Sequence, residues 1–420
     1  MTAEFQAEDP GIMMVTRQPV FDRRLQPWGT AMCFSQTEAS MLFSDDGAAN
    51  MLLEAYLPQR GPTNAQTIVY FPAQAVLDRM PRLLWPQGVV VELDETAGDL
   101  DGIPKAVAEL KQAGYGIAVS GFRNCASCRT LNGLADLIIS DARIADTAPP
   151  LEERIQATHA FGAKSLVRGL DSWHPMLQAR AINADMFQGF FFNDMNLKPS
   201  QKSVTATQVS RMRLLECLDK PDTDFKGLAR LVEMDAALTY RLLLFLNSAS
   251  FGLARQVTSI QQAIVLAGWK PLKKWLEVVL LTDLSPTPRH QELCYYAAQR
   301  AGFLKRCAQA AGKESLMPRL SLLGLLSYIE AILEMPPTQA LADVPVESEI
   351  RLALCGQQSS LSPWLTMVRA METADWGMAA QLASHIGLTL GDLSRCYLDS
   401  LTEADTLFRL LPAPQQILKA

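Results

Sequence analysis

The sequence predicts two classes of fold in one chain, a parallel β/α barrel followed by an all-α bundle. In the first half, short apolar runs alternate with helix-like stretches, which is typical of parallel β/α architecture. A polar segment at 193–208, with Pro199, interrupts this pattern, and almost everything after it has helical periodicity. We therefore expect a barrel over residues 13–195, a linker over 196–208 and a helical domain over 209–412.

The barrel strands are predicted from one hairpin and six apolar runs. Several runs are continuous rather than alternating, as expected for strands buried on both faces. The hairpin is expected around residues 19–34. The six runs cover residues 67–72, 88–94, 116–122, 134–141, 163–170 and 184–192. Together they fit a reduced TIM-like β/α barrel, in which functional groups usually follow the carboxyl ends of the strands.

Helix-like stretches fill the gaps between the runs. Val107 and Leu110 lie one helical turn apart, and Gly114 is placed to end their helix. The stretches 151–163 and 173–183 fill the next two gaps. Each run is thus followed by a helix that can cover the barrel.

The second half reads as a helical bundle of about two layers. Apolar residues recur at helical spacing over 224–250 and again over 319–335. Ser259 and Gln262 form a capping box for a helix that ends at Gly268. A further helix is expected to start at the Pro of "PLKKWLEVVLL" (271–281).

Composition argues against several classes of function. The 420 residues are 49% hydrophobic and 20% charged, which is ordinary for a folded soluble protein. The net charge of −6 lacks the basic excess of most nucleic-acid binders. No apolar run reaches the roughly 18 residues that span a membrane, and the acidic start "MTAEFQAEDPG" does not resemble a signal peptide. We expect a cytoplasmic protein.

Cys125 and Cys128 form the one closely spaced pair among eight cysteines. A zinc site needs about four ligands, and the four histidines offer no second pair at ligand spacing. We expect this pair to be structural or without a role, with metal or redox work as the alternative. A disulfide framework is not expected in a reducing cytosol.

Four segments resemble a known tandem family. Residues 247–275, "NSASFGLARQVTSIQQAIVLAGWKPLKKW", resemble the signature of HDOD domains, which are relatives of the HD phosphohydrolases without their metal ligands. Residues 17–29 and 184–192 resemble the first and last segments of EAL domains, which hydrolyse the bacterial second messenger cyclic di-GMP. Residues 324–354 resemble EAL-HDOD tandem proteins of bacterial signalling, and the likeness extends over about 13–410.

The resemblance implies that several catalytic positions of the EAL family hold other residues here. Hydrolysis of a phosphodiester at such a site uses two divalent metals, which prefer carboxylate ligands. The positions of the family's acids, Asn and Lys residues fall on Ala31, Tyr70, Ser120, Gly121, Ser140 and Gly169.

Four site positions keep an acid or an amide, namely Glu92, Asp141, Asp171 and Gln188. They are either the remnant of a ligand pocket or solvated strand-end residues with capping roles. Because so few carboxylates remain, we expect no bound metal, no cofactor and no enzymatic activity.

The HDOD half is expected to bind partners or to have a structural role. It contains no His–Asp pair for a metal, no phosphate-binding Gly-rich loop and no nucleophile elbow. The signature residues are Asn247, Ser248, Phe251, Gly252, Ser259 and Gly268.

The expected function is a non-catalytic scaffold or regulator, in which the bundle presents a groove to an unidentified protein partner or to a second copy. The first alternative is a sensor that binds cyclic di-GMP without cleaving it, through Arg17, Gln18, Asp171 and Gln188. We rank it second because the remaining acids would repel the phosphates. The second alternative is an active phosphodiesterase with unorthodox ligands.

Overall fold

The computed structural model describes residues 14–34, 66–121, 128–144, 149–193, 195, 204–218, 268–284, 287–342 and 346–409. They form two compact units. The first unit takes in the described residues up to 195 together with 369–385 and 389–394. The second takes in the rest of the described chain. The first unit is thus assembled from separate stretches of sequence.

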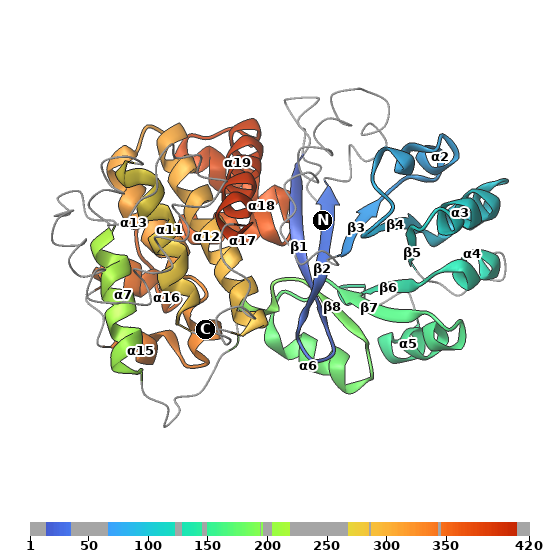
Figure 1. Cartoon of the computed structure of the whole chain (residues 1–420), viewed down its shortest axis with the longest axis horizontal. Helices are drawn as coiled ribbons and strands as arrows, with labels where there is room; N and C mark the ends of the chain where they lie inside the picture. The colour runs from blue at the N-terminus through green and yellow to red at the C-terminus, as the bar shows by residue number, and fades with distance from the viewer. Residues whose placement is uncertain are drawn as a thin grey trace, which may run out of the picture. The chain divides into compact units, whose positions relative to one another are not determined.

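The first unit is a closed barrel of eight strands, which confirms the predicted barrel (Figure 1). The hairpin supplies two strands and the six apolar runs supply the others. β1 pairs antiparallel with both β2 and β8, and all the other neighbours are parallel. The strands are β1 (Val15–Asp22), β2 (Pro27–Phe34), β3 (Gln66–Tyr70), β4 (Val89–Asp94), β5 (Gly116–Ser120), β6 (Leu137–Asp141), β7 (Lys164–Arg168) and β8 (Met186–Gln188).

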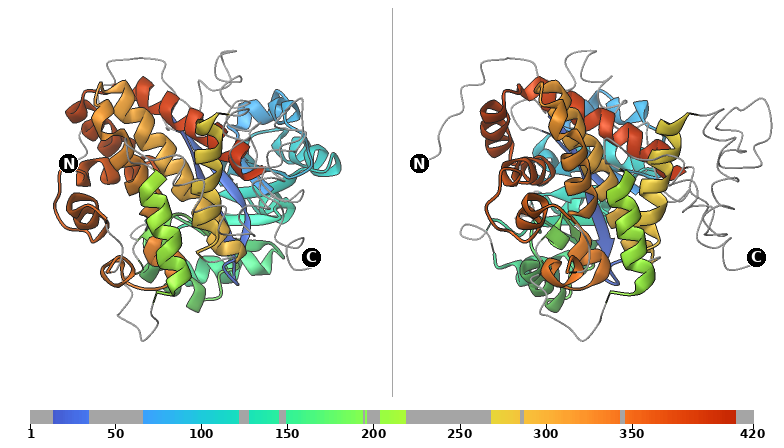
Figure 2. Two further views of the ribbon diagram at one scale, coloured as in Figure 1. Left: turned by 60° about the vertical axis from the view of Figure 1, so that its left-hand side comes forward. Right: turned by 90° about the vertical axis from the view of Figure 1, so that its left-hand side faces the viewer.

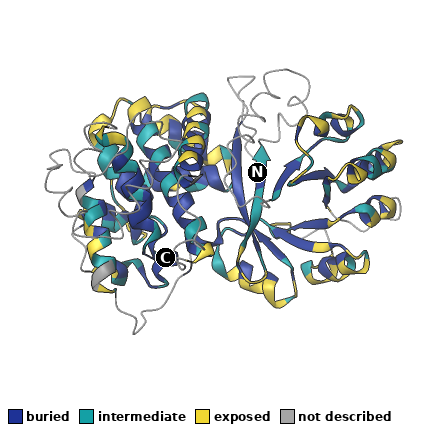
Figure 3. Cartoon of the chain, in the orientation of Figure 1, coloured by how far each residue is buried: buried dark blue, intermediate teal, exposed yellow. Residues whose placement is uncertain are grey.

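Short helices lie outside these strands (Figure 1). Their outer faces are exposed whereas the strands are buried (Figure 3), so the apolar runs form the core of the unit. The short helices of this unit are α2 (Ala73–Leu77), η1 (Met80–Leu83), η2 (Glu95–Asp99), α3 (Ile103–Gln112), α4 (Arg129–Leu134), α5 (Leu151–Ala160), α6 (Trp173–Ala181) and η3 (Phe191–Asn193).

Aromatic rings pack beside the junction of β1 and β8, where the barrel closes. Phe21 packs edge-on against Phe191 and Phe192, with ring centroids 5.4 and 5.1 Å apart. All three rings are buried. The predicted segment 184–192 therefore contributes both the last strand and part of this aromatic cluster.

The second unit is helical, as predicted. Its helices include α7 (Ala206–Leu218), α11 (Trp269–Thr282), α12 (Pro288–Ala310), η5 (Glu314–Leu316), α13 (Met317–Leu326), α14 (Ile329–Leu333), α15 (Pro337–Ala340) and α16 (Ser348–Leu354). α7 and α11 lie side by side (Figure 2). α13 contacts α12 closely because Gly324 has no Cβ, and a Cβ there would lie 2.5 Å from the backbone of Ala301.

Three helices contain residues of both units, namely α17 (Ser362–Glu372), α18 (Trp376–Ile386) and α19 (Leu390–Arg409). Among the described residues, one stretch, Glu314–Leu333, is apolar enough by length and composition to cross a membrane. Two thirds of its apolar window is buried (67%), as in the core helix of a soluble protein. The sequence had suggested no such stretch, because polar residues interrupt the apolar ones.

Candidate ligand site at the mouth of the barrel

The barrel interior begins with an apolar layer that contains Val90, Ile139 and Leu166. Side chains alternate along a strand, so residues two positions further toward the carboxyl ends also face inward. On β1, which runs the opposite way, the equivalent residue comes two positions earlier. We call this set the mouth ring: Gln18, Cys33, Tyr70, Glu92, Ser120, Asp141, Arg168 and Gln188.

A buried ion pair joins Glu92 of β4 and Arg168 of β7. An Nη of Arg168 donates to Oε1 of Glu92 at 2.5 Å. The Glu92 side chain is 6% exposed and that of Arg168 is 23% exposed. Burial alone would lower the pKa of Arg168, but the charge and hydrogen bond of Glu92 outweigh it and leave this pKa raised. Removing either member of the pair would leave the other without this partner.

A second arginine holds Asp141, at the end of β6. The side chain of Arg143 donates to both carboxylate oxygens, at 3.1 and 2.9 Å, and its backbone N–H donates at 2.8 Å. Burial pushes the pKa of Asp141 up, but these hydrogen bonds outweigh burial and lower it. At Asp171 burial dominates and raises the pKa, with Arg143 opposing.

Two glycines make room for carboxylates at the mouth. Gly169 has a φ of +74°, and a Cβ there would lie 2.8 Å from Oδ1 of Asp141. Gly121 has a φ of +72°, and a Cβ there would lie 2.5 Å from Oδ2 of Asp94. Asp94 in turn caps η2 by accepting from the N–H of Thr96 at 2.9 Å. A side chain at position 121 would therefore collide with a carboxylate that already has a structural role.

Amide groups line the side of the mouth where the barrel closes. Nε2 of Gln188 donates to Oε1 of Gln18 at 2.8 Å, and Nε2 of Gln18 donates to the backbone carbonyl of Glu372 at 2.8 Å. Oε1 of Gln188 is buried and accepts no hydrogen bond within the described part of the chain. Burial raises the pKa of the Cys33 thiol to about 12, so Cys33 is a neutral neighbour of these amides.

The structure brings together most of the candidate residues. Gln18, Glu92, Asp141 and Gln188 belong to the mouth ring. Arg17 is buried on the opposite face of β1 from Gln18, because side chains alternate.

The structure describes one of the six HDOD candidate residues. Gly268 precedes α11 with a φ of +79°. The other five, Asn247, Ser248, Phe251, Gly252 and Ser259, lie outside the described residues. Their roles therefore stay predictions.

The sequence reasoning missed Arg168 and Arg143. The signal for Arg168 was present, because it follows the inward-facing Leu166 by two residues in a predicted strand. Arg143 lies in the turn after β6, where strand periodicity gives no direction.

The expectation about the cysteines needs one correction. Cys128 is disulfide-bonded, so the expectation of a reduced thiol at this position is wrong. Cys125 lies outside the described residues.

The donors described at the mouth do not fit a pair of divalent metals. Within the described ranges, no three His, Cys, Asp or Glu residues are grouped so that they could hold a metal ion. Glu92 and Asp141, which could serve as ligands, already bind arginines. Tyr70 is protonated at neutral pH, since burial raises its pKa, with Asp94 and Glu92 adding to the effect.

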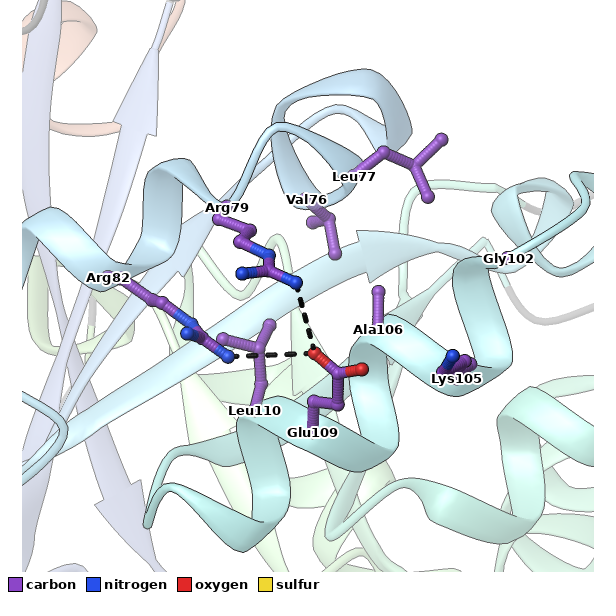
Figure 4. Close-up of a pocket in the computed structure, with 9 residues that line it drawn as sticks. All are labelled: Val76, Leu77, Arg79, Arg82, Gly102, Lys105, Ala106, Glu109 and Leu110. Carbon is purple, nitrogen blue, oxygen red and sulfur yellow. Dashed lines mark ion pairs between the residues drawn. The ribbon is translucent and has the colours of Figure 1, made fainter.

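A separate hollow of about 140 Å³ lies on the outside of the barrel, between α2, η1 and α3. Arg79 and Arg82 point toward the carboxylate of Glu109, at 3.9 and 3.6 Å (Figure 4). All three side chains are more than a third exposed, so solvent screens these pairs. This hollow contains none of the mouth ring residues, and the chemistry of the mouth does not extend to it.

Comparison with known proteins covers both halves of the chain. Residues 206–335 match the model of the HDOD domain. The cyclic di-GMP phosphodiesterase CdgJ of Vibrio cholerae is 25% identical over 406 residues, which are 94% of this chain and 93% of the relative. The uncharacterized protein YuxH of Bacillus subtilis is 25% identical over 405 residues, 93% of this chain and 97% of the relative. These matches support the tandem EAL–HDOD organisation predicted from the sequence.

Two solved structures are similar to this chain at a low level. The complex of BlrP1 from Klebsiella pneumoniae with calcium and cyclic di-GMP is 17% identical, with a TM-score of 0.35, over 43% of this chain and 55% of that one. The EAL domain of Mycobacterium smegmatis DcpA is 14% identical, with a TM-score of 0.34, over 43% of this chain and 91% of that one. At these TM-scores the likeness carries no argument beyond the barrel described above.

The comparisons contradict the expectation that this chain is not an enzyme. A relative that matches almost its entire length is a named phosphodiesterase. The resemblance places Ala31, Ser120 and Gly121 where EAL domains have acids, and this alone does not show that catalysis is lost.

Proposed function

We propose that this EAL–HDOD protein acts in cyclic di-GMP signalling by binding the dinucleotide at the mouth ring. The observation that carries the proposal is the arginine partner of each acid there, Arg168 for Glu92 and Arg143 for Asp141. The similarity to CdgJ supports the choice of ligand.

The arginines also remove the earlier objection to such binding. Unpaired acids would repel the two phosphates, but a carboxylate neutralised at 2.5–2.9 Å contributes little repulsion at a distance. Guanidinium groups bind phosphate oxygens through charge-assisted hydrogen bonds. The amides of Gln18 and Gln188 offer neutral donors and acceptors of the kind that a base edge requires.

The direct test is titration calorimetry with cyclic di-GMP. We expect saturable heat from the wild-type protein and the same heat from Arg180→Gln, an exposed arginine of α6 at the opposite end of the barrel. Absence of heat from the wild-type protein at millimolar ligand would refute the proposal.

Hydrolysis of cyclic di-GMP is the second candidate function, favoured by the name of the relative CdgJ. Chromatography of the reaction mixture with magnesium or manganese present would show the linear dinucleotide. If the mouth ring is the site, Glu92→Gln abolishes that product. Turnover that survives Glu92→Gln would place hydrolysis elsewhere.

A further inference from the structure

We propose that the mouth ring holds the phosphodiester of its ligand through the guanidinium groups of Arg168 and Arg143, without a divalent cation. This inference rests on the proposed function, because it names the chemistry by which that same site would recognise cyclic di-GMP.

The two arginines at the mouth have N–H donors that their carboxylate partners leave unused. A guanidinium has five N–H groups. Within the described part of the chain, Arg168 uses one of them, toward Glu92. Arg143 keeps one terminal nitrogen that makes no hydrogen bond in that part of the chain, and its side chain is 57% exposed. Both arginines can therefore hold their carboxylates and still donate to a phosphate.

The mouth ring leaves little space for the carboxylate ligands of a divalent metal. The carboxylates of Glu92 and Asp141 are committed to these arginines. An acid at position 121 or 169 would strain the backbone, which has a positive φ there, and would require the carboxylate of Asp94 or Asp141 to shift. Gly121 and Gly169 leave room for the carboxylates of Asp94 and Asp141. The two arginines pair with the carboxylates of Glu92 and Asp141.

The buried side-chain oxygen of Gln188 is an independent indication of a ligand. Gln188 is 98% buried by residue area, since only 2% is exposed, yet its Oε1 accepts no hydrogen bond from the described residues. A buried acceptor without a donor costs free energy, and such groups in proteins are normally paired with a ligand or water. The amide belongs to the same ring as Arg168, so a ligand bound there by its phosphate would bring an N–H within reach.

The experiment is titration calorimetry of the full chain with cyclic di-GMP, in EDTA and again in magnesium. We expect equal affinity in the two buffers. Arg143→Gln and Arg168→Gln should each weaken binding roughly ten- to a hundredfold in EDTA, as expected for loss of a hydrogen bond from a charged group. Arg180→Gln, at the opposite end of the barrel, is the matched control.

Two further variants guard against unfolding. Arg168→Gln leaves Glu92 buried without this partner, so the double variant Glu92→Gln/Arg168→Gln, which replaces both members of the pair with neutral side chains, should fold and still bind weakly. The Arg143 side chain is 57% exposed, so its replacement should lose only the pairing with Asp141, and the circular dichroism melt should keep a single cooperative transition.

The outcomes separate the two proposals. Binding in magnesium but not in EDTA would overturn the cation-free recognition and uphold cyclic di-GMP as the ligand. Binding in EDTA that both arginine variants retain would also overturn it. Silence in both buffers would refute the proposed function, and this inference with it.

Discussion

At the scale of single residues, two glycines shape the mouth of the barrel because they have no side chain. Gly169 lies against the pair formed by Asp141 and Arg143, and Gly121 lies against Asp94. Each glycine has a positive φ that other residues adopt at a cost. Replacing one of them therefore tests the backbone and the neighbouring carboxylate at once.

We predict that Gly169→Ala destabilises the protein by about 1–3 kcal/mol and also weakens ligand binding, because the new methyl group displaces Asp141 and Arg143. The matched control is Gly162→Ala. Its φ of +76° imposes similar strain, but nothing lies within 4 Å of the new methyl group. Urea denaturation and calorimetry should show a loss of stability in both variants and a loss of affinity only at position 169. Equal affinity in both would contradict the prediction.

A second prediction concerns acid stability. The pKa of Asp141 is lowered in the folded state, so its pairing with Arg143 stabilises the protein above the ordinary aspartate pKa of about 3.9. That contribution is lost as the pH falls through the lower folded value. Asp141→Asn should therefore reduce stability at pH 6 and flatten its fall between about pH 5 and 3, as measured by urea denaturation. Asp101→Asn, an exposed site, serves as the control, and an unchanged pH profile in Asp141→Asn would count against the ion pair.

The resemblance to EAL domains predicted part of this site, because it pointed to Glu92 and Gln188 as retained positions. Strand periodicity applied to Leu166 identifies Arg168. It could not indicate that Arg143 turns back onto Asp141, because turn residues follow no period. Nor could it indicate that position 121 is filled by the carboxylate of Asp94, which depends on the pairing of β4 with β5.

At the scale of elements, a barrel side chain caps a helix that comes much later in the sequence. The last carbonyls of a helix lack partners within it. Nε2 of Gln18, on β1, satisfies the carbonyl of Glu372 at the end of α17, and the contact is buried. The stretch 369–385 belongs to the same compact unit as the barrel. Gln18 therefore serves both as a neighbour of Gln188 and as a cap.

We predict that Gln18→Leu loosens this helix end, because the carbonyl of Glu372 loses the hydrogen bond from Gln18, which contributes about 0.5–1.5 kcal/mol. Amide hydrogen exchange, read by mass spectrometry, should speed up in peptides covering 369–385 and stay unchanged in α12. Gln74→Leu removes an exposed hydrogen bond to Asp78 and is the matched control. Unchanged exchange over 369–385 would show that the cap contributes nothing.

At the scale of the whole molecule, the order of elements along the chain does not match the division into compact units. The chain leaves the first unit after the barrel, and returns to it at 369–385 and 389–394. Hydrophobic periodicity could predict a barrel and a bundle and the change between them. It could not assign part of the last helices to the barrel, because their amphipathic pattern is the same whichever neighbour they pack against.

We predict that a chain ending at residue 195 has a weaker barrel than the full chain, since it lacks the stretches at 369–394 and leaves Gln18 without its partner. Amide exchange in the peptides of β4 and β5 should be faster in the shortened chain. Adding residues 362–409 in trans should slow it again. Equal exchange rates in the short and full chains would show that the barrel does not need the later stretch.

The return of the chain to its first unit also limits how such a gene can recombine. A single crossover between codons 196 and 368 would join this barrel to another lineage's residues 369–394. Gln18 would then donate to a carbonyl on a helix that evolved beside a different hairpin. Exchange of domains between relatives is therefore expected to succeed only when the two inherited parts, the barrel and these late residues, travel together.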